Sequence, residues 1–240
     1  MQLLKQTLCT AIALVALNSR SQTPGSVDTG FNTYDTGYYR GDSGANGIFS
    51  MARQPDGKVL VGVASLKRYF FDGSADANFT TGAAAGLPSP SIDKILVQSD
   101  GKILVSGHFT TFNGSAAVGI VRLSAAGVVD NTFSSGTGIT GGYGLDMVQQ
   151  PDGKVVVVGS FTGYNGNACG RIVRLNTDGS YDATFATGTG FTSQVRAIAR
   201  QSNGSFLVGG TFSAYNGTNR LGMARISSSG ALDATYDPGG

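Results

Sequence analysis

Residues that could carry acid–base or nucleophilic chemistry are scarce in this chain of 240 residues. All 15 acidic residues are Asp, and His108 is the single histidine. A Ser-His-Asp site would have to use His108, but the corresponding places in two similar downstream segments hold Ser160 and Thr211. We therefore interpret His108 as a variable polar position. A metal site built on several histidines is excluded.

Acid–base cleavage of a glycosidic bond needs two carboxyl groups, one of them with a raised pKa. Asp93 and Asp146 are the only acidic residues inside the first predicted strands of the repeats described below, and we align them with one another. They could line a channel, but solvated strand residues explain them more simply. The sequence therefore predicts no catalytic residue.

Asn176, Asp178 and Asp182 form a run of oxygen-bearing residues around a Gly turn, as in a calcium loop. The full spacing and the terminal Glu of such a loop are absent. Asp and Asn also bond to their own backbone, so a tight turn explains the run better. Cys169 has only Arg171 as a basic neighbour, which favours a packed thiol over a reactive one. We predict no metal and no cofactor.

Internal repeats are the elements that position these residues. Residues 54–58, 98–102, 150–154 and 201–205 are variants of Gln-Pro-Asp-Gly-Lys, and their starts differ by 44, 52 and 51 residues. A second element, Phe-Thr-x-Tyr-Asn-Gly in its clearest form, occupies residues 109–114, 161–166 and 212–217. A third element at residues 174–185 has relatives at 68–79, 122–133 and 225–236. One structural unit therefore recurs along the chain.

Short β-branched and aliphatic runs separate these markers, and Asp-Gly or Asn-Gly pairs join the runs. Such pairs favour type I′ hairpin turns, in which both central residues have positive φ. The 37 glycines and the absence of Glu disfavour helices. We predict an all-β fold with almost no helix: a β-propeller built of four-stranded antiparallel blades. A β-solenoid is the alternative.

The predicted blade repeats cover approximately residues 32–79, 80–133, 134–185 and 186–236. Residues 25–31 match the fourth strand of a repeat and form a spare element. Because this element has no partner within the sequence, we expect an incomplete propeller of about four blades with exposed ends.

Residues 1–21 have the pattern of a signal peptide. Lys5 precedes ten weakly polar to apolar residues, 8–17, and small residues at 19 and 21 indicate cleavage before Gln22. We therefore predict a secreted or cell-surface protein, residues 22–240, with no membrane insertion after cleavage. Loss of Lys5 and Arg20 leaves 15 of the 17 basic residues against 15 Asp, so nothing favours nucleic acid as a partner.

The full repeat, best seen at residues 150–185, resembles the delta-60 repeat family of exported bacterial β-propeller proteins. The matching pattern is Gln-x-Asp-Gly-Lys, four apolar residues, Gly-x-Phe-Thr-x-Tyr-Asn-Gly and then Arg-Leu-Asn-x-Asp-Gly-Ser-x-Asp-x-x-Phe. The resemblance covers essentially all of residues 22–240 and implies an extracellular propeller, but no particular ligand. Residues 65–71 depart from the pattern, so we expect an irregular first blade.

Recognition is expected at the rim that carries the Asn-Gly turns and the longer blade-to-blade links, because long loops on a rigid scaffold usually bind ligands. The aromatic residues of these turns could stack on a sugar or peptide, or they could brace the turns against the neighbouring blade. The candidate ligand-binding residues at this rim are Phe112, Asn113, Tyr164, Asn165, Tyr215 and Asn216.

The predicted function is that of a non-catalytic exported scaffold for binding, adhesion or surface display. Its partner is an unknown extracellular ligand, carbohydrate or protein. The alternative is an exported hydrolase or lyase that acts on polysaccharide, with its site in blades outside this sequence.

Overall fold

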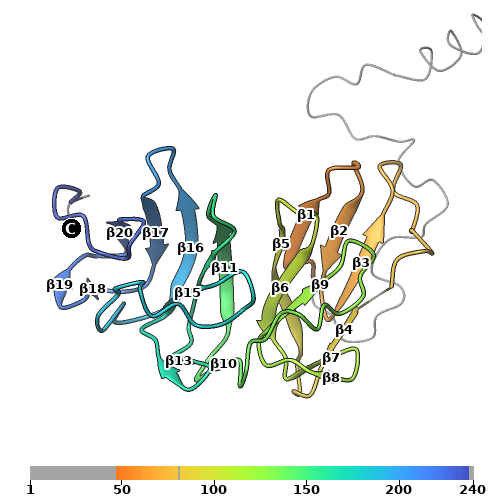
Figure 1. Cartoon of the computed structure of the whole chain (residues 1–240), viewed down its shortest axis with the longest axis horizontal. Coiled ribbons are helices and arrows are strands. Elements are labelled where there is room, and N and C mark those ends of the chain that lie inside the picture. The colour runs from red at the N-terminus through yellow and green to blue at the C-terminus, as the bar shows by residue number, and fades with distance from the viewer. Residues whose placement is uncertain (1–46, 81, 238–240) are drawn as a thin grey trace, which may run out of the picture. The chain divides into compact units, whose positions relative to one another are not determined.

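The computed structural model describes residues 47–80 and 82–237, and within them every regular element is a β-strand (Figure 1). The all-β class is therefore confirmed for these residues. None of them forms a helix that could cross a membrane. The predicted signal peptide (1–21), the spare strand element (25–31) and the start of the first repeat (32–46) lie outside the described residues.

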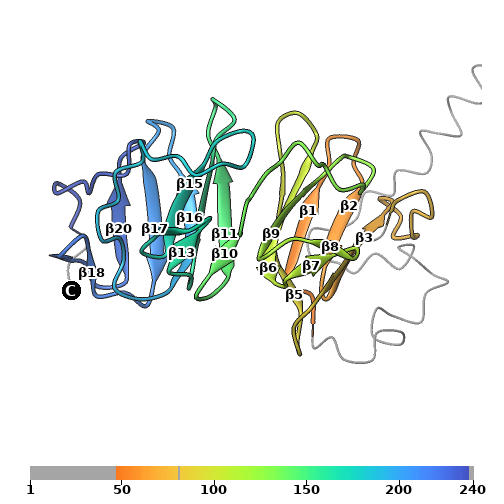
Figure 2. The same cartoon turned by 60° about the horizontal axis from the view of Figure 1, so that its bottom comes forward.

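Each repeat contributes three antiparallel strands that lie side by side in one sheet (Figure 2). We call these the first to fourth sheets. They are β1(Ser50–Arg53), β2(Val59–Gly62) and β3(Ser65–Tyr69); β5(Ser91–Val97), β6(Ile103–His108) and β9(Ile120–Leu123); β11(Gly144–Gln149), β12(Val155–Gly159) and β15(Ile172–Leu175); β16(Val195–Arg200), β17(Phe206–Gly210) and β20(Met223–Ile226). The first strands of consecutive sheets contact one another, β1 with β5, β5 with β11, and β11 with β16.

Three small hairpins lie between the second and third strands of the last three sheets. They are β7(Thr111–Phe112) with β8(Ser115–Ala116), β13(Gly163–Tyr164) with β14(Asn167–Ala168), and β18(Ala214–Tyr215) with β19(Thr218–Asn219). Each also pairs with the link that precedes its sheet, through β4(Gly82–Ala85), β10(Ile139–Thr140) or Phe191. β4 additionally pairs with β3, which joins the first sheet to the first hairpin. The Asn-Gly turns thus close separate hairpins instead of joining two sheet strands directly.

The Asn-Gly turns have the predicted type I′ conformation. Asn165 and Gly166 both have positive φ, at 46° and 75°, which is the combination that this turn requires. Because β11 and β12 are joined at Asp152-Gly153, the hairpin that follows the other end of β12 begins at the opposite edge of the third sheet. The predicted separation of the two kinds of turn onto opposite edges is confirmed for this repeat.

The type I′ prediction is wrong for the Asp-Gly turns. Between β11 and β12 only Gly153 has positive φ, at 84°, and its N–H donates to the carbonyl of Gln150 at 3.0 Å. This is a type I turn followed by a left-handed glycine, a common three-residue hairpin loop. Pro151 presets φ for the first turn position, and Asp152 accepts a hydrogen bond from the Lys154 N–H at 3.2 Å.

The expected fourth strand of each blade is reduced to a single bridge. In the third repeat Leu175 pairs with Tyr181 alone. The chain then turns at Asp182, whose Oδ1 accepts hydrogen bonds from the N–H and the hydroxyl of Thr184 at 3.0 and 2.6 Å. Such a turn competes with strand pairing and ends the segment. The equivalent bridges are Tyr69 with Ala75, Leu123 with Val129, and Ile226 with Leu232.

The core lies between consecutive sheets, and the middle strands β6 and β12 are buried on both faces. All five residues of β12 are buried. Side chains alternate along a strand, so Val155 and Val157 pack toward the second sheet while Val156 and Val158 pack toward the fourth. Each fully buried aliphatic side chain contributes about 1.5–3 kcal/mol. The periodic runs of Val, Ile and Leu therefore hold the sheets face to face.

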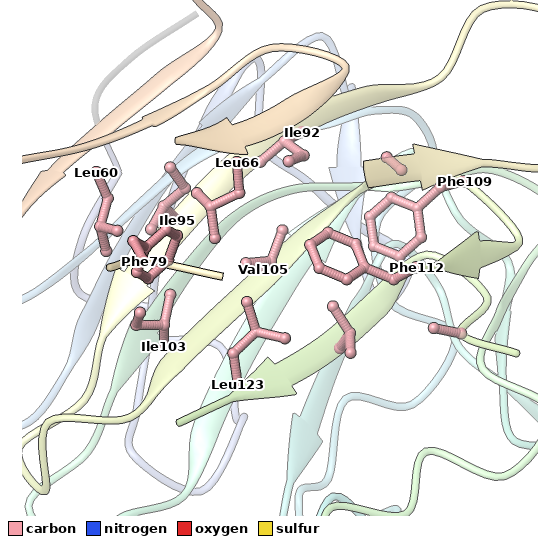
Figure 3. Packing of buried hydrophobic residues seen from close by; sticks show 13 residues of the cluster. Leu60, Leu66, Phe79, Ile92, Ile95, Ile103, Val105, Phe109, Phe112 and Leu123 are labelled. Carbon is pink, nitrogen blue, oxygen red and sulfur yellow. The ribbon is translucent and has the colours of Figure 1, made fainter. Parts of the chain in front are cut away.

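Between the first and second sheets the core is built from aliphatic residues and three Phe rings. Figure 3 shows Leu60 and Leu66 of the first sheet beside Ile95, Ile103 and Val105 of the second. Phe79, Phe109 and Phe112 complete the cluster, and the last two rings lie 5.8 Å apart between centroids. The link and the hairpin of the second repeat thus share one core with the two sheets.

A buried arginine in the third strand of each of the first three sheets connects that sheet to the next. Each guanidinium holds an Asp of its own repeat through Nε at 2.7–2.9 Å and stacks on a Phe ring. Its Nη1 donates to a backbone carbonyl in the turn of the following sheet at 2.5–2.7 Å. The three pairs of donor and acceptor are Arg68 and Ala125, Arg122 and Thr177, and Arg174 and Ser228.

Candidate binding site

The Asn residues of the predicted site attach their hairpins to the link before the sheet. Asn113 Oδ1 accepts a hydrogen bond from the Ala83 N–H at 2.8 Å. Asn165 and Asn216 do the same with Thr137 and Thr189, both at 3.3 Å. Positive φ at each Asn turns the side chain back toward this link. The side chains of the three Asn residues therefore have a structural role, which is to fix each hairpin to its link.

The three aromatic residues of the predicted site are buried beneath the hairpins. Phe112, Tyr164 and Tyr215 are at most 1% exposed. Burial raises the pKa of both Tyr hydroxyls well above its usual value, and each hydroxyl donates to a glycine carbonyl, at Gly179 or Gly230. The rings therefore brace the turns, and in this structure none of them offers a face to a ligand. A binding role for these turns stays a prediction.

A cavity of about 310 Å³ lies at the same edge, between the second sheet and the link to the third. His108, at the end of β6, and Tyr143, just before β11, line it with ring centroids 5.3 Å apart. His108 Nδ1 lies 3.1 Å from the Ser89 carbonyl. Phe109 and Ile139 form part of its apolar wall. This cavity combines aromatic surface with groups that can hydrogen-bond.

Asp93 lies on β5, within electrostatic reach of His108 at the end of β6. Burial raises the pKa of the Asp93 carboxyl, and a hydrogen bond from Ser91 and the charge of His108 act in the opposite direction. Its Oδ2 is buried and has no hydrogen-bond partner among the described residues. Asp93 occupies the bulge between Ile92 and Lys94, where the register of β5 and β6 shifts.

Asp146 is not the counterpart of Asp93, so the alignment of these two carboxylates is wrong. Asp146 pairs with Val158 in the sheet, as Lys94 pairs with Ser106, and the residue that matches Asp93 is Leu145. Asp146 binds Lys94 Nζ at 2.6 Å. It also accepts a hydrogen bond from the Ile198 N–H at 2.9 Å. It therefore links three sheets, whereas Asp93 lies next to the cavity-lining His108.

The run resembling a calcium loop serves as a turn. Asp178 accepts the Ser180 N–H at 3.0 Å, Asn176 donates to the Ser180 hydroxyl, and Asp182 binds Arg174 and Lys154, both at 2.7 Å. Across residues 47–80 and 82–237 no three His, Cys, Asp or Glu side chains cluster as metal ligands. Cys169 is buried, and burial raises the pKa of its thiol to about 11.

A second cavity, of about 480 Å³, lies at the Asp-Gly edge between the second and third sheets. Lys102, Gln149 and Asp178 are among the residues that line it. Gln149 Oε1 accepts the Ser99 N–H at 2.9 Å across the two sheets. This cavity is polar and has no aromatic residue in its lining, in contrast to the one beside His108.

Tyr143 was not predicted as a site residue, and His108 was interpreted as a variable polar position. Tyr143 aligns with Ser91 and Gln194, and His108 aligns with Ser160 and Thr211. Tyr143 and His108 are distinguished by one feature. Each places a ring at a position where the aligned repeats hold small or polar residues. The aromatic residues that recur in the hairpins, Phe112, Tyr164 and Tyr215, are by contrast part of the core.

Three consecutive segments, residues 98–133, 150–185 and 201–236, match a family model described as a β-propeller domain of unknown function, DUF5122. The chain is thus a protein with β-propeller repeats. No curated protein matches it.

Several solved structures are similar to this chain at low sequence identity. A Bacteroides caccae protein of unknown function is 13% identical, with 80% of this chain and 81% of that chain covered and a TM-score of 0.37. A catalytically inactive virginiamycin B lyase from Staphylococcus aureus, solved with quinupristin, is 17% identical, with 78% and 54% covered and a TM-score of 0.46. Aldose sugar dehydrogenase from Streptomyces coelicolor, in its PQQ-bound form, is 13% identical, with 82% and 80% covered and a TM-score of 0.42. This chain therefore spans about half the length of the lyase.

Proposed function

We propose that this chain is an exported, non-catalytic repeat protein of the delta-60 type, and that it binds an extracellular carbohydrate in the cavity beside His108 and Tyr143. One observation carries the proposal: two rings, 5.3 Å apart, line a cavity of about 310 Å³ at the edge that bears the hairpins and links. Ligand sites are typically apolar and aromatic hollows of this size with a few polar groups.

The chemistry of the lining favours a sugar. The C–H face of a sugar ring packs against an aromatic side chain, while its hydroxyls need donors and acceptors close by. Tyr143 and His108 supply both a ring and a polar group, and Thr110 adds a hydroxyl. The links that frame this edge vary in length between repeats, which suits a recognition surface on a rigid scaffold.

Binding is tested with a panel of soluble polysaccharides by affinity electrophoresis and calorimetry. We expect Tyr143→Ala and His108→Ala each to weaken binding at least tenfold, because each removes a ring from the cavity. Phe71→Ala is the matched control, since it removes an aromatic ring that is 84% exposed and lies outside the cavity. Retention of full affinity by both cavity variants would reject the site.

Export is proposed from the sequence of residues 1–21. Expression of the full chain in a bacterial host, followed by fractionation and N-terminal sequencing, tests it. We expect the mature protein outside the cytoplasm, beginning at Gln22. A full-length chain that stays in the cytoplasm would contradict this part of the proposal and would leave the binding test unaffected.

Asp93 supports the alternative, an exported hydrolase or lyase. A partly buried carboxyl group whose pKa is raised, and which interacts with the charge of His108, is a candidate general acid. Incubation of the same polysaccharides with the chain, followed by an assay for new reducing or unsaturated ends, distinguishes the two functions. Products that disappear in Asp93→Asn would establish the enzyme and refute the non-catalytic role.

A further inference from the structure

The arginine contact that joins consecutive sheets is incomplete at the fourth sheet. Arg225 occupies the position of Arg174 and binds Asp233 through Nε at 2.8 Å. Its Nη1, however, has no acceptor among the described residues. The Arg225 side chain is 25% exposed, whereas those of Arg68, Arg122 and Arg174 are at most 9% exposed. The fourth sheet therefore presents an unused donor.

The first sheet presents the complementary acceptor. The carbonyls that receive the arginines belong to Ala125, Thr177 and Ser228, and the aligned residue of the first repeat is Phe71. No described residue donates to the Phe71 carbonyl. The turn that carries it is open, since the Phe71 side chain is 84% exposed.

Apolar residues show the same contrast at both faces. Met223 of β20 is 43% exposed, whereas the aligned residues of the other third strands, Leu66, Ile120 and Ile172, are at most 1% exposed. Met51 of β1 is 59% exposed, whereas the aligned residues of the other first strands, Ile95, Met147 and Ile198, are at most 8% exposed. Among residues 47–80 and 82–237, seven of the eight exposed large hydrophobic residues belong to the first and fourth repeats, and Val128 is the exception.

We infer that a second copy of this chain docks its first sheet against the fourth sheet, head to tail. The contact repeats the interfaces inside the chain: Met223 and Met51 become buried, and Arg225 donates to the Phe71 carbonyl of the partner. The two faces differ, so the association is heterologous, and each copy uses one face as donor and the other as acceptor. Three interfaces of the same chemistry already join consecutive sheets within the chain. The exposed face of the fourth sheet would continue this series, so the surface that fits it is the first sheet of another copy.

Two variants of the full chain test the orientation. Met223→Asp places a charge on the fourth-sheet face, and Met51→Asp places one on the first-sheet face. Wild-type protein should associate in analytical ultracentrifugation, and each variant alone should be monomeric, with association weakened at least 100-fold. An equimolar mixture of the two variants should form a 1:1 dimer, because it retains one intact pair of faces.

Val128→Asp is the control, since Val128 is an exposed apolar residue of the second repeat and lies at neither face. It should associate as the wild type does. Circular dichroism and a cooperative thermal transition establish that each variant is folded. A monomeric wild type would overturn the inference and would point to a different partner or to closure within one chain. Persistent association of either variant alone would also overturn it, since a symmetric contact between like faces behaves in that way.

Discussion

The third and fourth repeats share strands, register and turns, yet they hold their last Asp differently. In the third repeat Asp182 is bound by both Arg174 and Lys154, at 2.7 Å each, and its side chain is 4% exposed. In the fourth repeat Arg225, at 2.8 Å, is the one ion-pair partner of Asp233 among the described residues, and the Asp233 side chain is 27% exposed. Ser205 occupies the position that Lys154 fills in the third repeat.

The nearly equal Arg–Asp distances indicate that the local repeat sequence alone forms this pair. The burial of the pair in the third repeat depends on two other features, the next sheet and the lysine that follows the first turn, Lys154. Removal of one member of a buried pair leaves an uncompensated charge, whereas exposed pairs contribute little. The same motif should therefore stabilise the third repeat strongly and the fourth repeat weakly.

The largest expected effect is that of Asp182→Ala. This change leaves the charges of Arg174 and Lys154 without their carboxylate, and it should lower the free energy of unfolding by about 3 kcal/mol. Asp233→Ala should lower it by clearly less, because Arg225 is already hydrated. Urea denaturation followed by circular dichroism measures both. Equal losses in the two variants would show that burial does not set the strength of the pair.

Acid should remove a smaller part of the stability. Burial alone would raise the pKa of Asp182, but hydrogen bonds from Lys154, Thr184 and Arg174 outweigh it and hold the pKa well below its usual value of about 3.9. Asp130 is held low in the same way. A carboxyl group whose pKa is lowered in the folded state contributes its full stability above about pH 4. This contribution is lost as the pH falls toward the folded-state pKa.

The Asp182 and Asp130 side chains are 4% and 12% exposed, and the lowered pKa of each carboxyl contributes on the order of 1 kcal/mol. The free energy of unfolding should therefore fall between pH 5 and pH 2.5. The Asp182→Ala variant should show a flatter dependence over this range, because one of the two groups no longer titrates. A variant with the wild-type slope would assign the acid sensitivity to other carboxylates. Urea midpoints at matched ionic strength give the measurement.

Repeat spacing predicted the first three strands of each sheet and their antiparallel pairing, because markers such as Gln150 and Gly153 lie at fixed places in the hairpins. Turn chemistry predicted the edge of the sheet at which each turn lies, but it did not predict the conformation of every turn. Asn165 tolerates positive φ, so its turn is type I′ as predicted, whereas Pro151 commits its turn to type I. The length of the fourth strand was overestimated. The Asp182 side chain bonds to the backbone of its own turn in competition with strand pairing, and a pattern of apolar residues does not reveal this competition.

The candidate site was less predictable. Tyr164 recurs in the repeats because its hydroxyl and ring hold the hairpin, so recurrence identified a structural residue instead of a binding one. Tyr143 and His108 come together only because β6 ends, and β11 begins, at the same edge of the sheets. Asp93 precedes Gln98 by five residues and Asp146 precedes Gln150 by four, so the two were misaligned by one position, and the strand pairing shows that the residue matching Asp93 is Leu145. Contacts between strands, not residue spacing, decide these positions.

The smallest expected effect is that of Ser205→Lys, which gives the fourth repeat the lysine of the third. Asp233 accepts hydrogen bonds from Thr235 and Arg225, and these already lower the pKa of its carboxyl. A lysine at position 205 should add one partly exposed ion pair and raise the midpoint of thermal unfolding by about 1–2 °C. Differential scanning calorimetry at low and high salt measures the change, which should shrink as salt screens the pair.

Lys154→Ser is the reciprocal variant, and it should lower the midpoint by more than Ser205→Lys raises it. The pair it breaks is more buried, since Lys154 is 29% exposed and Asp182 only 4%, so the Asp182 charge loses a partner that water replaces poorly. In the double variant Lys154→Ser/Ser205→Lys the two changes should add, because they act on different carboxylates in different sheets. Equal and opposite single shifts would mean that the lysine acts through its own turn in both repeats, and that burial by the neighbouring sheet does not distinguish the third repeat from the fourth.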